Sequence, residues 1–189
     1  GILACCSPGA FPVCAAGNPG AVVGESGVSG GLVVCIEPDD PDDAAALRVD
    51  PRYVVQALYA DHDEAMKARK QLAAAGVLGP VGARVWNGTR LPFANDLVRL
   101  IVAGSGSKLS PDEIMRALCP GGVAMVRSGG GFTKMVKPWP DDIDEWTHYL
   151  HGPDNNAVAA DTRIGPPRSL RWVSGPRWAR SHDHLSSFS

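Results

Sequence analysis

The chain has 189 residues, of which 44% are hydrophobic and 20% are charged, and its formal net charge is -2. This length suits one globular domain with an appendage, and the apolar content is sufficient for a core. The small net charge gives no overall attraction for nucleic acid, and no run approaches the ~18 apolar residues that a membrane-spanning helix needs. We therefore expect a soluble protein that binds no nucleic acid and has no membrane span.

Apolar runs and helix signals alternate along the middle of the chain. Asp61 or Asp63 can cap a helix that closes at Gly76, and Ser110 followed by Pro111 is typical of a second helix start. Short apolar runs between these signals are typical of buried strands. The predicted elements, in order, are strands at 32–36 and 53–59, a helix over 63–76, strands at 81–86 and 97–103, a helix over 110–118 and a strand at 123–127.

Strands that alternate with helices at this spacing predict an α/β fold with a Rossmann-like, doubly wound and mainly parallel sheet. The sequence divides into a flexible N-terminal segment at 1–29, this domain at 30–136, and an irregular C-terminal extension at 137–189.

Two stretches carry a resemblance to a known family. Residues 113–124, EIMRALCPGGVA, resemble the late helix, turn and strand of class I methyltransferases, in which E-x-x-R-x-L-x-P-G-G leads into the fifth strand. Residues 87–103, NGTRLPFANDLVRLIVA, are similar to the strand region before it. The resemblance implies that S-adenosylmethionine would be held by a glycine-rich loop after the first strand and by an acid at the end of the second.

The chain departs from that pattern at both places. Residues 37–43, EPDDPDD, contain no glycine, and Tyr59 stands where the ribose-binding acid aligns, with Asp61 two residues later. We therefore predict a degenerate methyltransferase-like domain, for which we do not expect S-adenosylmethionine. Glu37, Asp39 and Asp61 are the candidate cofactor-binding residues.

The acidic run at 37–43 has a second interpretation. Its carboxylates are hard oxygen ligands that calcium prefers, although the run lacks the glycine turn and the final glutamate of a calcium-binding hand. A solvated loop is the favoured interpretation of these residues.

The last part of the chain carries a second resemblance. Residues 137–140 (KPWP), 144–151 (DEWTHYLH), 155–158 (NNAV) and 165–168 (GPPR) resemble the junction, in large exported bacterial proteins, between a methyltransferase-like domain and a pyrroloquinoline-quinone-type β-propeller. The resemblance implies an exported or periplasmic parent whose propeller, starting near Leu170, is truncated here. Pyrroloquinoline quinone is therefore not expected to bind, because a propeller needs several four-stranded blades. The tryptophans of the tail could drive homo-oligomerisation.

Four histidines lie in the same extension. His148 and His151 would share a face if 143–150 formed a helical turn, and His182 and His184 would share a face on a strand. With nearby acids these pairs could bind a divalent metal such as zinc and activate a water for hydrolysis, with Asp183 and His184 as catalytic residues. The alternative is that the histidines are polar packing groups.

Three functions follow from these patterns. The sequence favours a small-molecule-binding or structural Rossmann-like module, from a truncated quinoprotein-like parent, without methyltransferase activity. The alternatives are a metal-dependent hydrolase acting on esters or lactones through the histidine cluster, and an S-adenosylmethionine-dependent methyltransferase.

Overall fold

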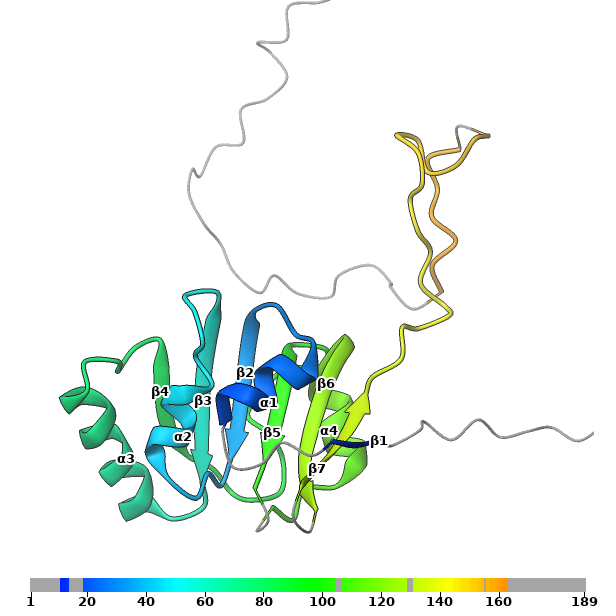
Figure 1. Cartoon of the computed structure of the whole chain (residues 1–189). Coiled ribbons are helices and arrows are strands. Elements are labelled where there is room, and N and C mark those ends of the chain that lie inside the picture. Colours follow the sequence, from blue (N-terminus) through cyan, green and yellow to red (C-terminus); the bar gives the residue numbers. More distant parts are fainter. Residues whose placement is uncertain (1–10, 14–18, 105–106, 129–130, 155, 163–189) are drawn as a thin grey trace, which may run out of the picture. The chain divides into compact units, whose positions relative to one another are not determined.

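A computed structural model of the chain describes residues 11–13, 19–104, 107–128, 131–154 and 156–162 (Figure 1). The strands are β1 (Phe11–Val13), β2 (Gly31–Ile36), β3 (Tyr53–Tyr59), β4 (Val81–Val85), β5 (Val98–Ala103), β6 (Leu118–Ser128) and β7 (Gly131–Val136). The helices are α1 (Pro19–Ser26), α2 (Pro41–Ala46), α3 (His62–Ala74) and α4 (Pro111–Ala117).

The strands form one seven-stranded sheet in the order β1-β7-β6-β5-β2-β3-β4. The pairs β2–β3, β3–β4, β2–β5 and β5–β6 are parallel, whereas β7 is antiparallel to both β6 and β1. The predicted fold class, a doubly wound and mainly parallel α/β sheet, is confirmed. The strand order reverses between β2 and β5, and this switch point is where ligands bind in sheets of this kind.

Local sequence explains where the helices begin and end. The Asp61 carboxylate accepts hydrogen bonds from the backbone N–H groups of Asp63 and Glu64, which caps α3, and Gly76 beyond its end has a φ of 70°. The Ser110 hydroxyl caps α4 in the same way, by accepting from the Glu113 N–H. These capping residues are the ones that the sequence predicts.

The structure has helix α2 where the sequence predicts that the loop at 37–43 continues. Asp40 accepts a hydrogen bond from the Asp42 N–H, and Pro41 occupies the first turn, so the acidic run is a capped helix start. The helix has only six residues, which is too short for a periodic apolar pattern to reveal it.

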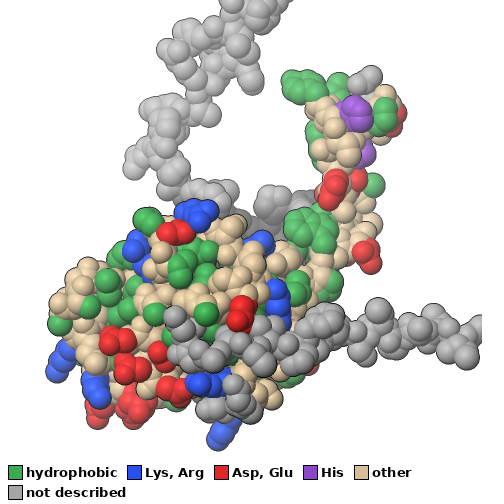
Figure 2. Space-filling model, in the orientation of Figure 1, with side chains coloured by type: hydrophobic (Ala, Val, Ile, Leu, Met, Phe, Trp, Pro, Cys, Tyr) green, Lys and Arg blue, Asp and Glu red, His purple; other side chains and the backbone are tan. Residues whose placement is uncertain are grey.

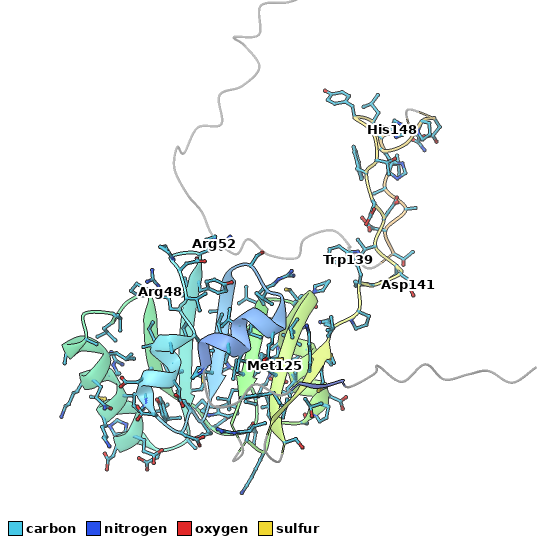
Figure 3. The ribbon with its side chains drawn as sticks, in the orientation of Figure 1. Arg48, Arg52, Met125, Trp139, Asp141 and His148 are labelled. Carbon is cyan, nitrogen blue, oxygen red and sulfur yellow. The ribbon has the colours of Figure 1, made fainter. Side chains whose placement is uncertain are left out.

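The sheet packs on both faces because alternate strand residues point to opposite sides. Val33 and Cys35 of β2 belong to a core cluster with residues of α1, α2 and α3, whereas Val34 and Ile36 belong to a second cluster with residues of α4. Met125 of β6, labelled in Figure 3, is fully buried in the first cluster.

The end of α4 also differs from the prediction. The sequence predicts a helix that ends at 118 and a strand that begins only at 123. In the structure strand β6 begins directly at Leu118. Its pairing with β5 is irregular between Val98 and Leu100, and Gly121 donates its N–H to the Lys137 carbonyl on the far side of the β6–β7 hairpin. The Pro-Gly-Gly segment is thus an irregular part of a strand.

The chain forms two compact units, Gly1–Trp139 and Pro140–Ser189. The sheet and its helices belong to the first. Among the described residues no helix is long and apolar enough to cross a membrane.

Candidate functional site

A pocket of about 150 Å³ lies at the switch point, at the carboxyl ends of β2 and β5. Cys35 of β2 and Val102 of β5 form part of its wall, and Gly104 follows β5 at its edge. The segment after β2, helices α1 and α2 and the β6–β7 hairpin contribute further lining residues: Pro19, Val22, Pro38, Asp39, Asp43, Leu47, Arg127 and Phe132.

The charged residues of the pocket lining are of both signs. Arg127 Nη1 donates to Asp39 Oδ2 at 2.5 Å, and the Arg127 guanidinium carbon lies 5.8 Å from the centre of the Phe132 ring. Asp43 is the second carboxylate, and burial is the main cause that raises its pKa above the ordinary value. The pocket can therefore contact positive and negative groups of one ligand.

The inner wall of the pocket is apolar and desolvated. Burial raises the pKa of the Cys35 thiol to about 12, with the carboxylates of Asp43 and Asp39 adding to the effect. This thiol is therefore protonated at neutral pH and acts as a small apolar group rather than as a nucleophile.

Gly104 is required for the close approach of two strand ends. Its N–H donates to the Ile36 carbonyl at 2.9 Å, and a Cβ atom at this position would overlap the carbonyl oxygen of Glu37. Any larger residue at 104 would separate β5 from the end of β2.

Glu37, a predicted cofactor-binding residue, does not line the pocket. Its carboxylate accepts hydrogen bonds from the Ala60 N–H at 2.8 Å and from Trp86 Nε1 at 3.4 Å. It thus joins the ends of β2, β3 and β4. Its φ of 49° lies in the left-handed region that glycine adopts most easily.

The other predicted cofactor-binding residues lie in different surroundings. Asp39 lies on the pocket rim, whereas the Asp61 carboxylate caps α3. Tyr59, which aligns with the expected ribose-binding acid, is 3% exposed, and its hydroxyl has no hydrogen-bond partner among the described residues. Figure 2 shows several acidic side chains, in red, that lie together on the first unit, near the start of α3.

His148 and His151, the predicted metal ligands of the second unit, do not lie on a helical turn. They form an isolated antiparallel bridge, in which the His148 N–H donates to the His151 carbonyl. His151 Nε2 lies 2.6 Å from Asp144 Oδ2, and His148 Nδ1 lies 2.8 Å from the Thr147 hydroxyl, so each imidazole has a different partner. His148 is labelled in Figure 3.

No metal site is seen in the part of the chain that the structure describes, where no three His, Cys, Asp or Glu side chains are placed to hold an ion. The remaining predicted metal and catalytic residues, His182, Asp183 and His184, lie outside the described residues. Asp144 instead stabilises the second unit locally, and the N–H groups of Ala160 and Glu145, together with His151, lower its pKa.

No protein-family model and no curated protein matches the chain. Solved structures with a similar fold do exist. One is assigned as an S-adenosyl-L-methionine-dependent methyltransferase from Methanococcus maripaludis, with a TM-score of 0.52, 22% identity, and coverage of 60% of this chain and 56% of that chain. Another is geranyl diphosphate C-methyltransferase from Streptomyces coelicolor A3(2) with Mg²⁺, geranyl diphosphate and S-adenosyl-L-homocysteine, with a TM-score of 0.51, 15% identity, and coverage of 57% and 43%.

A third is geranyl diphosphate methyltransferase in complex with SAM, with a TM-score of 0.50, 16% identity, and coverage of 57% of this chain and 46% of that chain. The chain thus spans about half the length of these proteins. At these identities the comparisons establish the fold.

The comparisons correct the expected relationship and function. The expected relation to a quinoprotein-like β-propeller protein is contradicted, because these three structures are of methyltransferases. They also contradict the expected module without methyltransferase activity and the metal-dependent hydrolase, and they favour the methyltransferase alternative over both.

The expectation against S-adenosylmethionine is contradicted by a protein of this fold that is solved in complex with it. The absence of glycine from 37–43 was one of the two reasons for that expectation. In the structure the backbone turn is made by Glu37 itself, and the close approach of strands is provided by Gly104, a residue of a different loop.

Sequence reasoning missed most of the pocket. Arg127, Cys35 and Gly104 come from three strand ends that are adjacent only through the pairing of β2 with β5 and of β5 with β6. The one local signal was a glycine directly after the apolar run that becomes β5.

Proposed function

We propose that this chain carries the fold and the cofactor site of an S-adenosylmethionine-dependent methyltransferase, with the cofactor in the switch-point pocket. The observation that carries the proposal is the position of the pocket, at the carboxyl ends of β2 and β5 where the strand order reverses. Ligands of open α/β sheets bind in the crevice at this point.

The residues present fit such a molecule. S-adenosylmethionine combines an adenosine part with a positively charged sulfonium and a zwitterionic amino-acid end. Val102 and Phe132 provide apolar contact, and Asp39, Asp43 and Arg127 provide charges of both signs. A pocket of about 150 Å³ is sized for part of the cofactor rather than for all of it.

The cofactor, when bound, supplies an electrophilic methyl group. The chain's own residues would orient the ligand and exclude water, Val22 and Val102 through apolar contact and Asp39 through its negative charge.

Calorimetric titration with S-adenosylmethionine tests the proposal. The wild-type chain should bind saturably, and Val102→Phe should weaken binding at least about tenfold by filling the pocket, a loss of more than ~1.4 kcal/mol. The matched control is Val54→Phe, which makes the same change on β3 at a residue that is 52% exposed and outside the pocket lining. This control should bind as the wild type does.

Two results would overturn the proposal. One is the absence of any binding of S-adenosylmethionine or S-adenosyl-L-homocysteine to the folded wild-type chain. The other is undiminished binding by Val102→Phe, which would place the cofactor elsewhere.

A further inference from the structure

The ion pair between Asp39 and Arg127 joins two sides of the pocket. Asp39 follows β2, and Arg127 lies near the end of β6, 88 positions away in the sequence. Their side chains are 60% and 37% exposed, so the pair lies at the mouth of the pocket rather than in the core. Both residues line the pocket.

Such a pair is easily exchanged for other partners. Exposed ion pairs contribute little net stability because water screens them and both side chains lose freedom. Arg127 also has donors to spare: of the five N–H groups of a guanidinium, only one on Nη1 has a hydrogen-bond partner among the described residues. The Arg127 guanidinium also lies over the Phe132 ring, within the range of a cation–π contact.

A guanidinium with several unused donors matches a carboxylate, which it can bind with two parallel hydrogen bonds. The released Asp39, together with Asp43 on the same lining, matches an ammonium group. One guanidinium beside two carboxylates does not suit a phosphate, whose charge the carboxylates would repel. The lining thus favours a group that carries both a carboxylate and an ammonium.

We propose that Asp39 and Arg127 recognise the α-amino-acid end of the ligand, by exchanging their mutual ion pair for two ion pairs with its carboxylate and its ammonium. This inference rests on the proposed function and assigns which end of the cofactor the pocket holds. Arg127 is then a specificity residue that discriminates nucleoside thioethers with the amino-acid chain from those without it.

The test compares two probes by calorimetry. S-adenosyl-L-homocysteine carries the amino-acid chain, and 5′-methylthioadenosine is the same nucleoside thioether without it. Arg127→Met keeps an unbranched stem over Phe132 and removes the donors. This variant should weaken the binding of S-adenosyl-L-homocysteine about 10- to 100-fold and leave the affinity for 5′-methylthioadenosine unchanged.

Matched variants separate recognition from folding. Arg84→Met removes an exposed arginine of β4 that does not line this pocket, and both probes should bind to it as to the wild type. Arg127→Lys keeps the charge but cannot form two parallel hydrogen bonds with a carboxylate. It should therefore cause an intermediate loss of affinity for S-adenosyl-L-homocysteine alone. If the thermal unfolding of Arg127→Met differs from that of the wild type, Arg127→Lys is used for the comparison instead.

The outcomes are distinct from those of the proposed function. Equal affinity of wild type and Arg127→Met for S-adenosyl-L-homocysteine overturns this inference and leaves the cofactor site standing. An equal loss for both probes also overturns it, because Arg127 would then be structural. Failure of both probes and of S-adenosylmethionine to bind the wild type overturns the proposed function and the inference together.

Discussion

Glu37 turns the chain out of β2 in a backbone conformation that an L-residue with a side chain adopts at a cost of order 1–3 kcal/mol. Two hydrogen bonds offset this cost, because its carboxylate accepts from the Ala60 N–H and from Trp86 Nε1. The side chain therefore links three strand ends beside the pocket. A glycine would make the same turn without strain but would leave that link unmade.

At the same scale, the burial of Cys35 sets its reactivity. The thiolate is the nucleophile in alkylation, and a pKa of about 12 leaves roughly one thiol in ten thousand ionised at pH 8. We expect iodoacetamide to label Cys35 at least about a hundredfold more slowly in the folded chain than in urea. Peptide mass spectrometry over time measures this, and equal rates in both conditions would contradict the burial of the thiol.

Among the elements, α4 fixes the loop between β4 and β5. Arg116 on α4 donates to the carbonyl oxygens of Leu91 and Phe93 and to the Asn95 side chain, and it pairs with Glu113 at 2.6 Å. Glu113 in turn accepts from the Leu91 N–H at 2.7 Å. The loop between β4 and β5 contains no helix, and the side chains of Glu113 and Arg116 form hydrogen bonds with several of its backbone groups.

The role of Glu113 gives a pH-dependent prediction. The hydrogen bond from Arg116 is the main cause that lowers the pKa of Glu113 below its ordinary value of 4.5. Its contribution is therefore fully present above pH 4.5 and is lost as the pH falls through the lower pKa of the folded state. Glu113→Gln should reduce the free energy of unfolding by about 1.5–3 kcal/mol at pH 7 and by less at pH 3.

Urea denaturation at the two pH values measures the effect. Asp112→Asn, an exposed neighbour on the same helix turn, is the control and should change the free energy of unfolding by less than about 0.5 kcal/mol. An equal loss for Glu113→Gln at both pH values would show that the ionised carboxylate is not responsible.

For the whole molecule, the buried hydrophobic side chains among the described residues all lie between Val22 and Met125. None belongs to the second compact unit, Pro140–Ser189, whose described contacts are hydrogen bonds and one ring contact around Asp144 and His151. The first unit therefore has its own core.

Truncation after Trp139 tests this independence. The shortened chain should keep the far-ultraviolet circular dichroism of a folded α/β domain and unfold within about 4 °C of the full chain, because a shift of that size corresponds to ~1 kcal/mol or less. Loss of the cooperative thermal transition would show that the second unit is needed for folding.

The sequence predicts much of the sheet and little of the site. The strand at 53–59 and the helix after Asp61 carry strong local signals, an unbroken apolar run and a cap, and the structure has both. Helices α1 and α2 are short, and β7 alternates weakly, so periodicity did not reveal them. The pocket was not predictable because its residues become neighbours only through the order of the strands in the sheet. No local sequence pattern specifies that order.

The central pairing of β2 with β5 also has a consequence for how the chain folds. Residues 33–36 pair with residues 100–103, so the middle of the sheet closes a loop of more than sixty residues. Long loops raise the entropic cost of contact formation and slow folding. During synthesis at the ribosome, β2 and β3 can meet early, but β2 keeps one open edge until Ala103 has emerged. A chaperone that binds exposed strand edges would therefore have time to bind β2, the strand that later forms part of the wall of the pocket.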